Sequence, residues 1–155
     1  MEILVNKDFG GYILSLKAKN EILKRKGIKF YIYRAFFDDK YNFQKLVKID
    51  ENQLQKLEDI PFCSVLFSTV NIDCTKTTSQ DDLNKIYDED DGFDKIFESR
   101  IDKDIIEIVK RLVALSMSKH STISIEEIPD GSFYEIHSYD GAETIYYSAS
   151  EILHK

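Results

Sequence analysis

The stretch IKFYIYRAFF, residues 28–37, says most about how this chain folds. Aromatic and β-branched side chains dominate it, and this composition predicts a strand. Asp38-Asp39-Lys40 then interrupts the strand, and residues 43–49 are predicted as a returning strand with Phe43, Lys45, Val47 and Ile49 on one side. Two consecutive strands joined by a short turn run antiparallel, so the sequence predicts an antiparallel sheet.

Outward from this hairpin, helices and strands are mixed along the chain. Ser15 is a suitable N-cap for a helix that Gly27 ends, Asp50 with Gln53 resembles a capping box, and Asp102 caps the most regular helix. Helices are predicted at 16–26, 51–58 and 102–117, and further strands at 2–5, 62–70, 122–128, 133–139 and 143–147. The predicted class is α+β, an antiparallel sheet packed with two main helices in a single compact domain over residues 1–155.

Residues 71–99 have a different character, with many acidic and hydroxyl side chains. We predict a long loop with short helical turns around Leu83-Ile86-Tyr87 and Phe93-Ile96-Phe97. The acidic cluster at 88–91 lacks the alternating spacing of a calcium loop, so a solvated surface is favoured over a cation site. The role of the acidic 81–98 segment stays open.

Composition limits the classes of partner. A net charge of −7 gives no basic face for phosphate neutralisation, so duplex nucleic acid is not expected as a partner. A small phosphorylated ligand needs only a local arginine or free backbone N–H groups, and net charge does not exclude it. Nine Tyr and ten Phe exceed what a core of this size needs, so some rings should lie on a binding surface or a subunit interface.

The two cysteines, Cys63 and Cys74, form no CxxC pair, and the three histidines lack ligand spacing. We therefore expect a reduced intracellular protein with no metal and no cofactor. No basic segment followed by a long apolar run opens the sequence, and no run approaches the length of a membrane span. The predicted compartment is the cytoplasm, without a membrane partner.

Three features are candidates for chemistry, each with a structural alternative. His120 near Ser118 and Ser121 lacks the orienting third group of a catalytic triad, and His137 beside Glu135 reads as a surface or interface histidine. Gly10-Gly11 lacks the spacing of a phosphate-binding loop and is typical of a tight turn. Arg100 opens the best helix and is a candidate anion ligand, with pairing to Asp102 or Asp104 as its alternative role.

Three segments, taken in order and spacing, resemble a family of small phage and prophage proteins that includes the Thoeris anti-defence sponges. They are NKDFGGY with Leu14-Ser15, then RIDKDIIEIV from Arg100, then IEEIPD from Ile125 with Glu135-Ile136 and Tyr139-Asp140-Gly141. Each is weak alone, and together they are fairly specific to the family. The chain departs from the usual pattern at Lys103, where relatives have proline, and in a longer, more acidic central region.

The resemblance implies a function. In Thoeris defence a TIR-domain enzyme makes a cyclic ADP-ribose isomer that activates an effector, and the sponge binds this signal without cleaving it. Family members look like homodimers with pockets at the subunit interface, some form hexamers, and some also bind cyclic oligonucleotides at separate sites. The resemblance implies that this chain is a binding protein, not an enzyme, and that it acts in the cytoplasm of the infected host.

The residues expected to bind the ligand follow from its two phosphates, adenine and riboses. Arg100 and the amides after it would serve the phosphates. Lys103 would add a phosphate contact or belong to the surface, and Asp102 at the same helix start is a further candidate ligand residue. Phe67, Ser68, Thr69 and Asn71 would offer a ring, hydroxyls and an amide. Phe9, Gly10 and Gly11 would close the pocket or shape the fold.

Two other classes of function stay open at this point. A phosphodiesterase or NAD-consuming hydrolase would need a metal or a paired carboxylate in the pocket, which the sequence does not suggest. A protein–protein inhibitor would use the acidic segment to plug a host factor.

Overall fold

The computed structural model describes residues 1–60 and 64–149, without the side chains of 89–92. All strand pairs in these residues are antiparallel and are mixed with helices, so the predicted α+β class is confirmed. The chain divides into two compact units, where the sequence suggested one domain. Unit 1 comprises Met1–Ala18 and Ser99–Lys155, and unit 2 comprises Lys19–Glu98.

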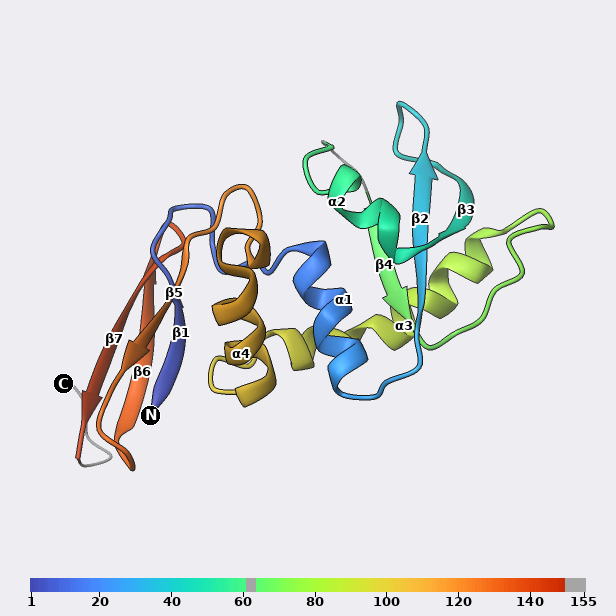
Figure 1. Ribbon diagram of the computed structural model, residues 1–155. Helices are drawn as coiled ribbons and strands as arrows, with labels where there is room; N and C mark the ends of the chain where they lie inside the picture. The colour runs from blue at the N-terminus through green and yellow to red at the C-terminus, as the bar shows by residue number, and fades with distance from the viewer. Residues whose placement is uncertain (61–63, 150–155) are drawn as a thin grey trace. The chain divides into compact units, whose positions relative to one another are not determined.

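Unit 2 is built on the predicted hairpin. Strands β2 (Tyr31–Phe37), β3 (Phe43–Ile49) and β4 (Ser64–Ser68) form a sheet in the order β3-β2-β4 (Figure 1). Alternation puts Tyr33 and Ala35 on one face of β2, where they join a buried cluster with Leu46, Leu66, Ile72, Leu83 and Ile86. The Tyr33 hydroxyl accepts a hydrogen bond from the Ile72 N–H at 2.8 Å, which fixes the segment that follows β4.

The predicted acidic loop is wrong, because most of it is helix α3 (Gln80–Phe97). Ser79 begins the helix with a capping box shared with Asp82. Leu83, Ile86, Phe93 and Phe97 are buried at helical spacing, while Asp81, Asp88 and Asp94 are exposed. Acidic side chains in its first turn also favour the helix, since they face its positive end.

The shorter elements of unit 2 follow their local signals. Helix α1 (Leu16–Arg25), which begins in unit 1, is capped by Ser15, whose Oγ accepts from the Ala18 N–H at 3.0 Å. Gly27 ends it with φ +70°, and the Ile28 N–H bonds back to the Leu23 carbonyl, as in a Schellman motif. The predicted capping box between Asp50 and Gln53 is confirmed at the short helices η1 (Glu51–Gln53) and α2 (Leu54–Leu57).

Unit 1 contains two strand pairs. β1 (Glu2–Asn6) pairs with β5 (Ile123–Glu127), and β6 (Phe133–Tyr139) pairs with β7 (Ala142–Ser148). The β6–β7 turn has positive φ at both Asp140 and Gly141, which is the type I′ geometry of two-residue hairpins. Ile3, Val5 and Ile128 form a small core that Tyr134, Ile136 and Ile145 of the hairpin cover.

Helix α4 (Lys103–Leu112) packs against β1 in unit 1. Its buried side chains Ile105, Ile106, Ile108 and Val109 occupy its first two turns. The sequence predicted a helix to residue 117, but Val113 takes φ 52° and the chain continues as a single 3₁₀ turn, η2 (Val113–Ser116). Val113 is 63% exposed, so beyond Leu112 there is little apolar burial to hold a regular helix.

Candidate functional site

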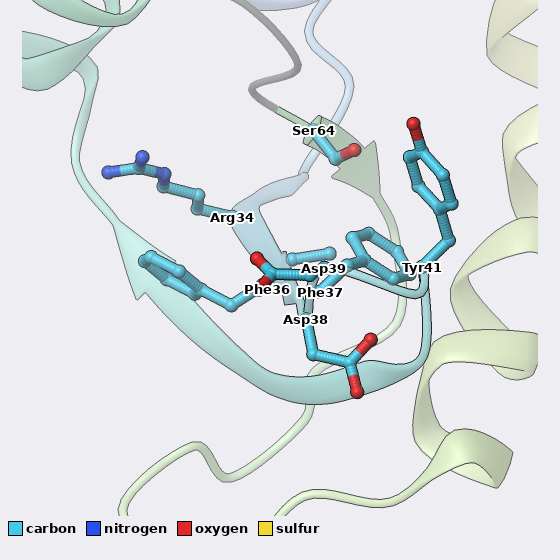
Figure 2. Close-up of a pocket in the computed structure, with 8 residues that line it drawn as sticks. Arg34, Phe36, Phe37, Asp38, Asp39, Tyr41 and Ser64 are labelled. Carbon is cyan, nitrogen blue, oxygen red and sulfur yellow. The ribbon is translucent and has the colours of Figure 1, made fainter.

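A hollow of about 600 Å³ lies in unit 2, where β2 ends and its turn begins (Figure 2). This volume is in the range of small-molecule sites. Arg34, Phe36 and Phe37 come from β2, and Asp38, Asp39 and Tyr41 from the turn, with Ser64 at the start of β4. The hollow therefore combines a cation, aromatic rings, carboxylates and a hydroxyl, which are the groups that bind nucleotides.

Asp38 organises the turn beside this hollow. Its Oδ1 accepts from the backbone N–H groups of Asn42 at 2.9 Å and Lys40 at 2.8 Å. These bonds, the one from Asn42 first, hold the pKa of Asp38 below its usual value. A lowered pKa makes this carboxylate a weaker base, and both hydrogen bonds hold it in the turn, so Asp38 positions the turn and Tyr41, whose side chain is 78% exposed.

Two cations lie against one ring on the adjoining sheet face. The guanidinium carbon of Arg34 is 4.6 Å from the centroid of Phe36, and the Lys45 ammonium is 5.1 Å from it. Both distances are within the range of a cation–π contact. Phe36 and Lys45 are direct partners in the β2–β3 register, which accounts for their proximity.

The expected ligand residues at the end of β4 have mostly structural surroundings. Phe67 is buried, with its ring centroid 6.0 Å from Phe30 and 6.4 Å from Phe97. Ser68 is buried and accepts from the Val70 N–H. Thr69 and Asn71 are exposed, and Asn71 accepts from the Lys48 ammonium. Only the last two residues are therefore accessible at this surface.

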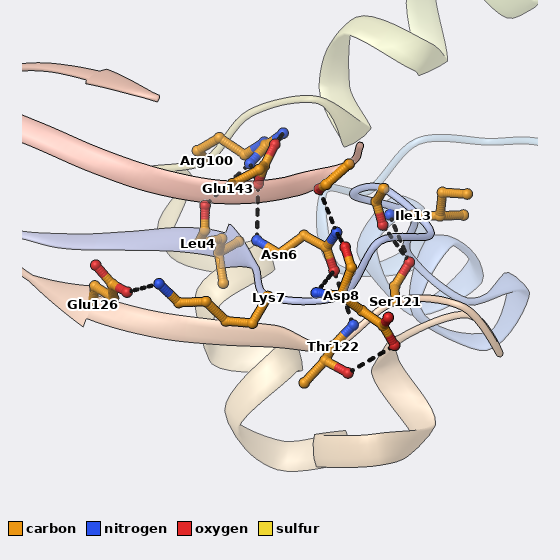
Figure 3. A network of polar contacts seen from close by, with 12 residues as sticks. Leu4, Asn6, Lys7, Asp8, Ile13, Arg100, Ser121, Thr122, Glu126 and Glu143 are labelled. Carbon is orange, nitrogen blue, oxygen red and sulfur yellow. Dashed lines mark hydrogen bonds and ion pairs between the residues drawn. The ribbon is translucent and has the colours of Figure 1, made fainter. Parts of the chain in front are cut away.

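Arg100 of unit 1 is held in a buried ion pair (Figure 3). Its two terminal nitrogens donate to the two carboxylate oxygens of Glu143, at 2.6 and 2.8 Å, and one also reaches the Leu4 carbonyl. The Arg100 and Glu143 side chains are only 20% and 8% exposed. The sequence offered Asp102 or Asp104 as alternative partners of Arg100. In the structure its partner is instead Glu143 of β7.

The surroundings of this pair fix both charges. Burial alone would raise the pKa of Glu143, but hydrogen bonds from Arg100 and from the Asn6 N–H outweigh it and hold the pKa below its usual range. The guanidinium also lies 3.6 Å from the ring centroid of Tyr12. Burial raises the pKa of Tyr12 to about 12, and among the described residues its hydroxyl has no hydrogen-bond partner.

Asn6 ties the same network to the neighbouring turns. Its side-chain amide donates to the carbonyls of Asp8 and Gly141, at 2.6 and 2.7 Å, and its Oδ1 accepts from the Thr122 N–H at 2.9 Å. The side chain is fully buried and uses both ends, so it specifies how β1, β5 and the β6–β7 turn meet.

The sequence suggested that the start of α4 presents open backbone amides for a phosphate, but the structure does not show this. The Asp102 carboxylate accepts from the N–H groups of Asp104 and Ile105, at 2.9 and 3.2 Å, and so occupies that position. Lys103 lines a separate hollow of unit 1, of about 580 Å³. Lys110 and Met1 line it as well, but so do four carboxylates, so it offers no clear preference for an anion. The carboxylates are those of Glu2, Glu107, Glu127 and Asp130.

The Phe9-Gly10-Gly11 turn shapes the fold of unit 1. A Cβ on Gly10 would lie 1.8 Å from the carbonyl oxygen of His120, so no other residue fits there without rearrangement. Gly11 has φ +89°, and its carbonyl accepts from the Ser121 hydroxyl at 2.6 Å. Phe9 is 67% exposed, so its side chain is accessible to a ligand.

The expected ligand residues thus fall into two groups. Arg100, Asp102, Lys103, Phe9, Gly10 and Gly11 belong to unit 1, and Phe67, Ser68, Thr69 and Asn71 to unit 2. Sequence reasoning missed Arg34, Phe36 and Tyr41 at the unit 2 hollow, and Glu143 in the unit 1 network. Alternation within the predicted strand 28–37 already placed Arg34 and Phe36 on one face, which is the signal that could have found them.

Comparison with known proteins adds no relative. No family model, curated protein or solved structure matches this chain. Within residues 1–60 and 64–149, histidine, cysteine and acidic side chains do not gather in groups of three or more that could hold a metal ion. Over the same residues, none of the helices combines the length and the apolar character that crossing a membrane requires.

Proposed function

We propose that this chain is a non-enzymatic binding protein that sequesters a cyclic ADP-ribose isomer and so withholds it from the effector of a Thoeris-type defence. The resemblance of the three segments around NKDFGGY, RIDKDIIEIV and IEEIPD motivates the ligand. The observation that carries the proposal is the unit 2 hollow of about 600 Å³ with rings of Phe37 and Tyr41 and the hydroxyl of Ser64. Second sites for cyclic oligonucleotides, and assembly as dimers or hexamers, remain expectations from the resemblance.

The chemistry of the hollow suits such a ligand. Aromatic rings stack on an adenine, and hydroxyl and carboxylate oxygens accept hydrogen bonds from ribose hydroxyls and the adenine amino group. Asp39 lines the hollow and supplies one such acceptor. The Asp38 carboxylate is engaged with its own turn, which favours binding over acid–base catalysis at this position.

The same geometry changes the expected part of Arg100 in binding. A phosphate would have to displace Glu143 from both terminal nitrogens of this guanidinium, and would leave a buried carboxylate without its partner. We therefore place the ligand in unit 2 and assign Arg100 to the stability of unit 1.

Isothermal titration of the full chain with a purified cyclic ADP-ribose isomer tests the proposal. We expect saturable heat, and chromatography of the ligand released by heat denaturation should return it unaltered. Absence of heat at micromolar ligand would remove the proposed function, and a changed product would identify an enzyme. If ligand does not bind but a host protein co-purifies in defined stoichiometry, the inhibitor alternative would replace it.

A further inference from the structure

We propose that Arg34, Phe36 and Lys45 form an anion site on the open face of the β2–β3 hairpin, and that this site binds the phosphates of the captured nucleotide. The inference deepens the proposed function and rests on it for the identity of the ligand. The anion chemistry of the site does not depend on the proposed function, because it follows from the placement of two cations beside the unit 2 hollow.

The sheet register brings these side chains to one face. Arg34 pairs with Val47 and Phe36 with Lys45, so the four side chains project from the same side of the hairpin. The opposite side carries Tyr33, Ala35 and Leu46 and is buried against α3. Arg34 and Phe36 are half-buried and Lys45 is exposed, so a ligand could reach both charged groups.

Within the described residues, the two cations of this face have no ion-pair partner, although Asp38 and Asp39 line the adjoining hollow. Neither Arg34 nor Lys45 makes an ion pair with a carboxylate in residues 1–60 and 64–149, although the chain as a whole carries −7. Holding two cations against one ring costs Coulomb repulsion. An anion that accepts hydrogen bonds from both would remove this cost, and the arginine fork can hold a phosphate through two of its N–H groups.

The site adjoins the hollow, because Arg34 and Phe36 line it together with Phe37 and Tyr41. Figure 2 shows Arg34 and Phe36 projecting to one side of it, and Phe37 and Tyr41 to the other. A nucleotide would thus place its phosphates on the Arg34 and Lys45 side and its base among the rings. Of the two carboxylates nearby, Asp38 is held by its turn, while Asp39 is suited to a ribose hydroxyl and not to a phosphate.

Variants of the full chain test this site. Because the Arg34 guanidinium would donate charge-assisted hydrogen bonds to the phosphates, we expect Arg34→Ala to weaken binding of the cyclic ADP-ribose isomer by about 10- to 100-fold. Arg34→Lys keeps the positive charge but loses the two-pronged guanidinium, so its affinity should lie between those of the parent and Arg34→Ala. Lys45→Met should weaken binding several-fold. The matched control Lys85→Ala removes one cation from the exposed surface of α3 and should leave the affinity unchanged.

The outcomes separate this inference from the proposed function. If the parent binds the cyclic nucleotide and both Arg34→Ala and Lys45→Met bind it equally well, the phosphates lie elsewhere and only this inference fails. If the parent does not bind it, the proposed function fails, and NMR titration with pyrophosphate decides the anion site alone. Shifts of the Arg34 and Lys45 side-chain signals would support the site, and their absence up to millimolar pyrophosphate would overturn it.

Discussion

Arg100 and Arg34 each lie against an aromatic ring, yet their surroundings assign them opposite roles. Arg100 contacts Tyr12 at 3.6 Å and gives both terminal nitrogens to the buried carboxylate of Glu143. Arg34 contacts Phe36 at 4.6 Å and shares that ring with a second cation. A buried arginine with its own carboxylate stabilises the fold, while an arginine that lies beside a second cation is suited to an anionic ligand.

The largest effect should come from breaking the unit 1 pair. Removing one partner of a buried ion pair leaves the other charge unpaired, so we expect Arg100→Ala to lower the free energy of unfolding by about 3 kcal/mol. Arg34→Ala should cost below about 1 kcal/mol, the range of an exposed cation–π contact. Urea unfolding of both variants measures the contrast. Equal losses of stability would remove the distinction drawn between the two arginines.

The two adjacent glycines of the NKDFGGY turn should differ next. Gly10→Ala forces a methyl group against the His120 carbonyl, and overpacking of this kind costs about 1–3 kcal/mol or more. Gly11→Ala meets no atom within 4 Å and bears only the left-handed backbone penalty of about 1–2 kcal/mol. We therefore expect Gly10→Ala to have a lower melting temperature than Gly11→Ala. A reversed order would show that the turn is not packed on His120 as described.

A smaller effect should appear in the pH dependence. The pKa of Glu143 in the folded protein lies below its ordinary value of 4.5, so the ionised side chain favours folding at neutral pH. This contribution to stability is lost as the pH falls from the ordinary pKa through the lower pKa of the folded state. Glu143→Gln cannot titrate at this position. The melting-temperature gap between the parent and Glu143→Gln should thus narrow in acid, and a gap that stays constant from pH 7 to acid would contradict the assignment.

Local sequence signals account for much of the fold. Aromatic and β-branched composition predicted β2, alternation predicted β3, Gly27 and the Asp50–Gln53 box marked helix ends, and Asp140-Gly141 marked a hairpin turn. The error at α3 came from reading acidic composition as a loop when the spacing of Leu83, Ile86, Phe93 and Phe97 was helical. There the burial of four apolar side chains decided the structure, and acidic residues such as Asp81, Asp88 and Asp94 lie on the exposed side of the helix.

The candidate site was less accessible to sequence reasoning. The start of α4 has the residues of an anion site, but a partner 43 positions away in the sequence, Glu143, takes up the guanidinium of Arg100. Nothing in the local sequence indicates such a pairing, because it depends on where β7 lies beside β1. Arg34 was overlooked for the opposite reason, since a single cation in an aromatic strand gives no motif until the register places Lys45 beside it.

The most direct test compares Arg34→Ala with Glu143→Gln by titration with the cyclic ADP-ribose isomer, at a temperature where circular dichroism shows both to be folded. The account predicts that Arg34→Ala binds about 10- to 100-fold more weakly than the parent, while Glu143→Gln, which frees the Arg100 guanidinium, binds with the affinity of the parent. Unchanged binding by Arg34→Ala together with altered binding by Glu143→Gln would place the phosphates at Arg100 and contradict the account.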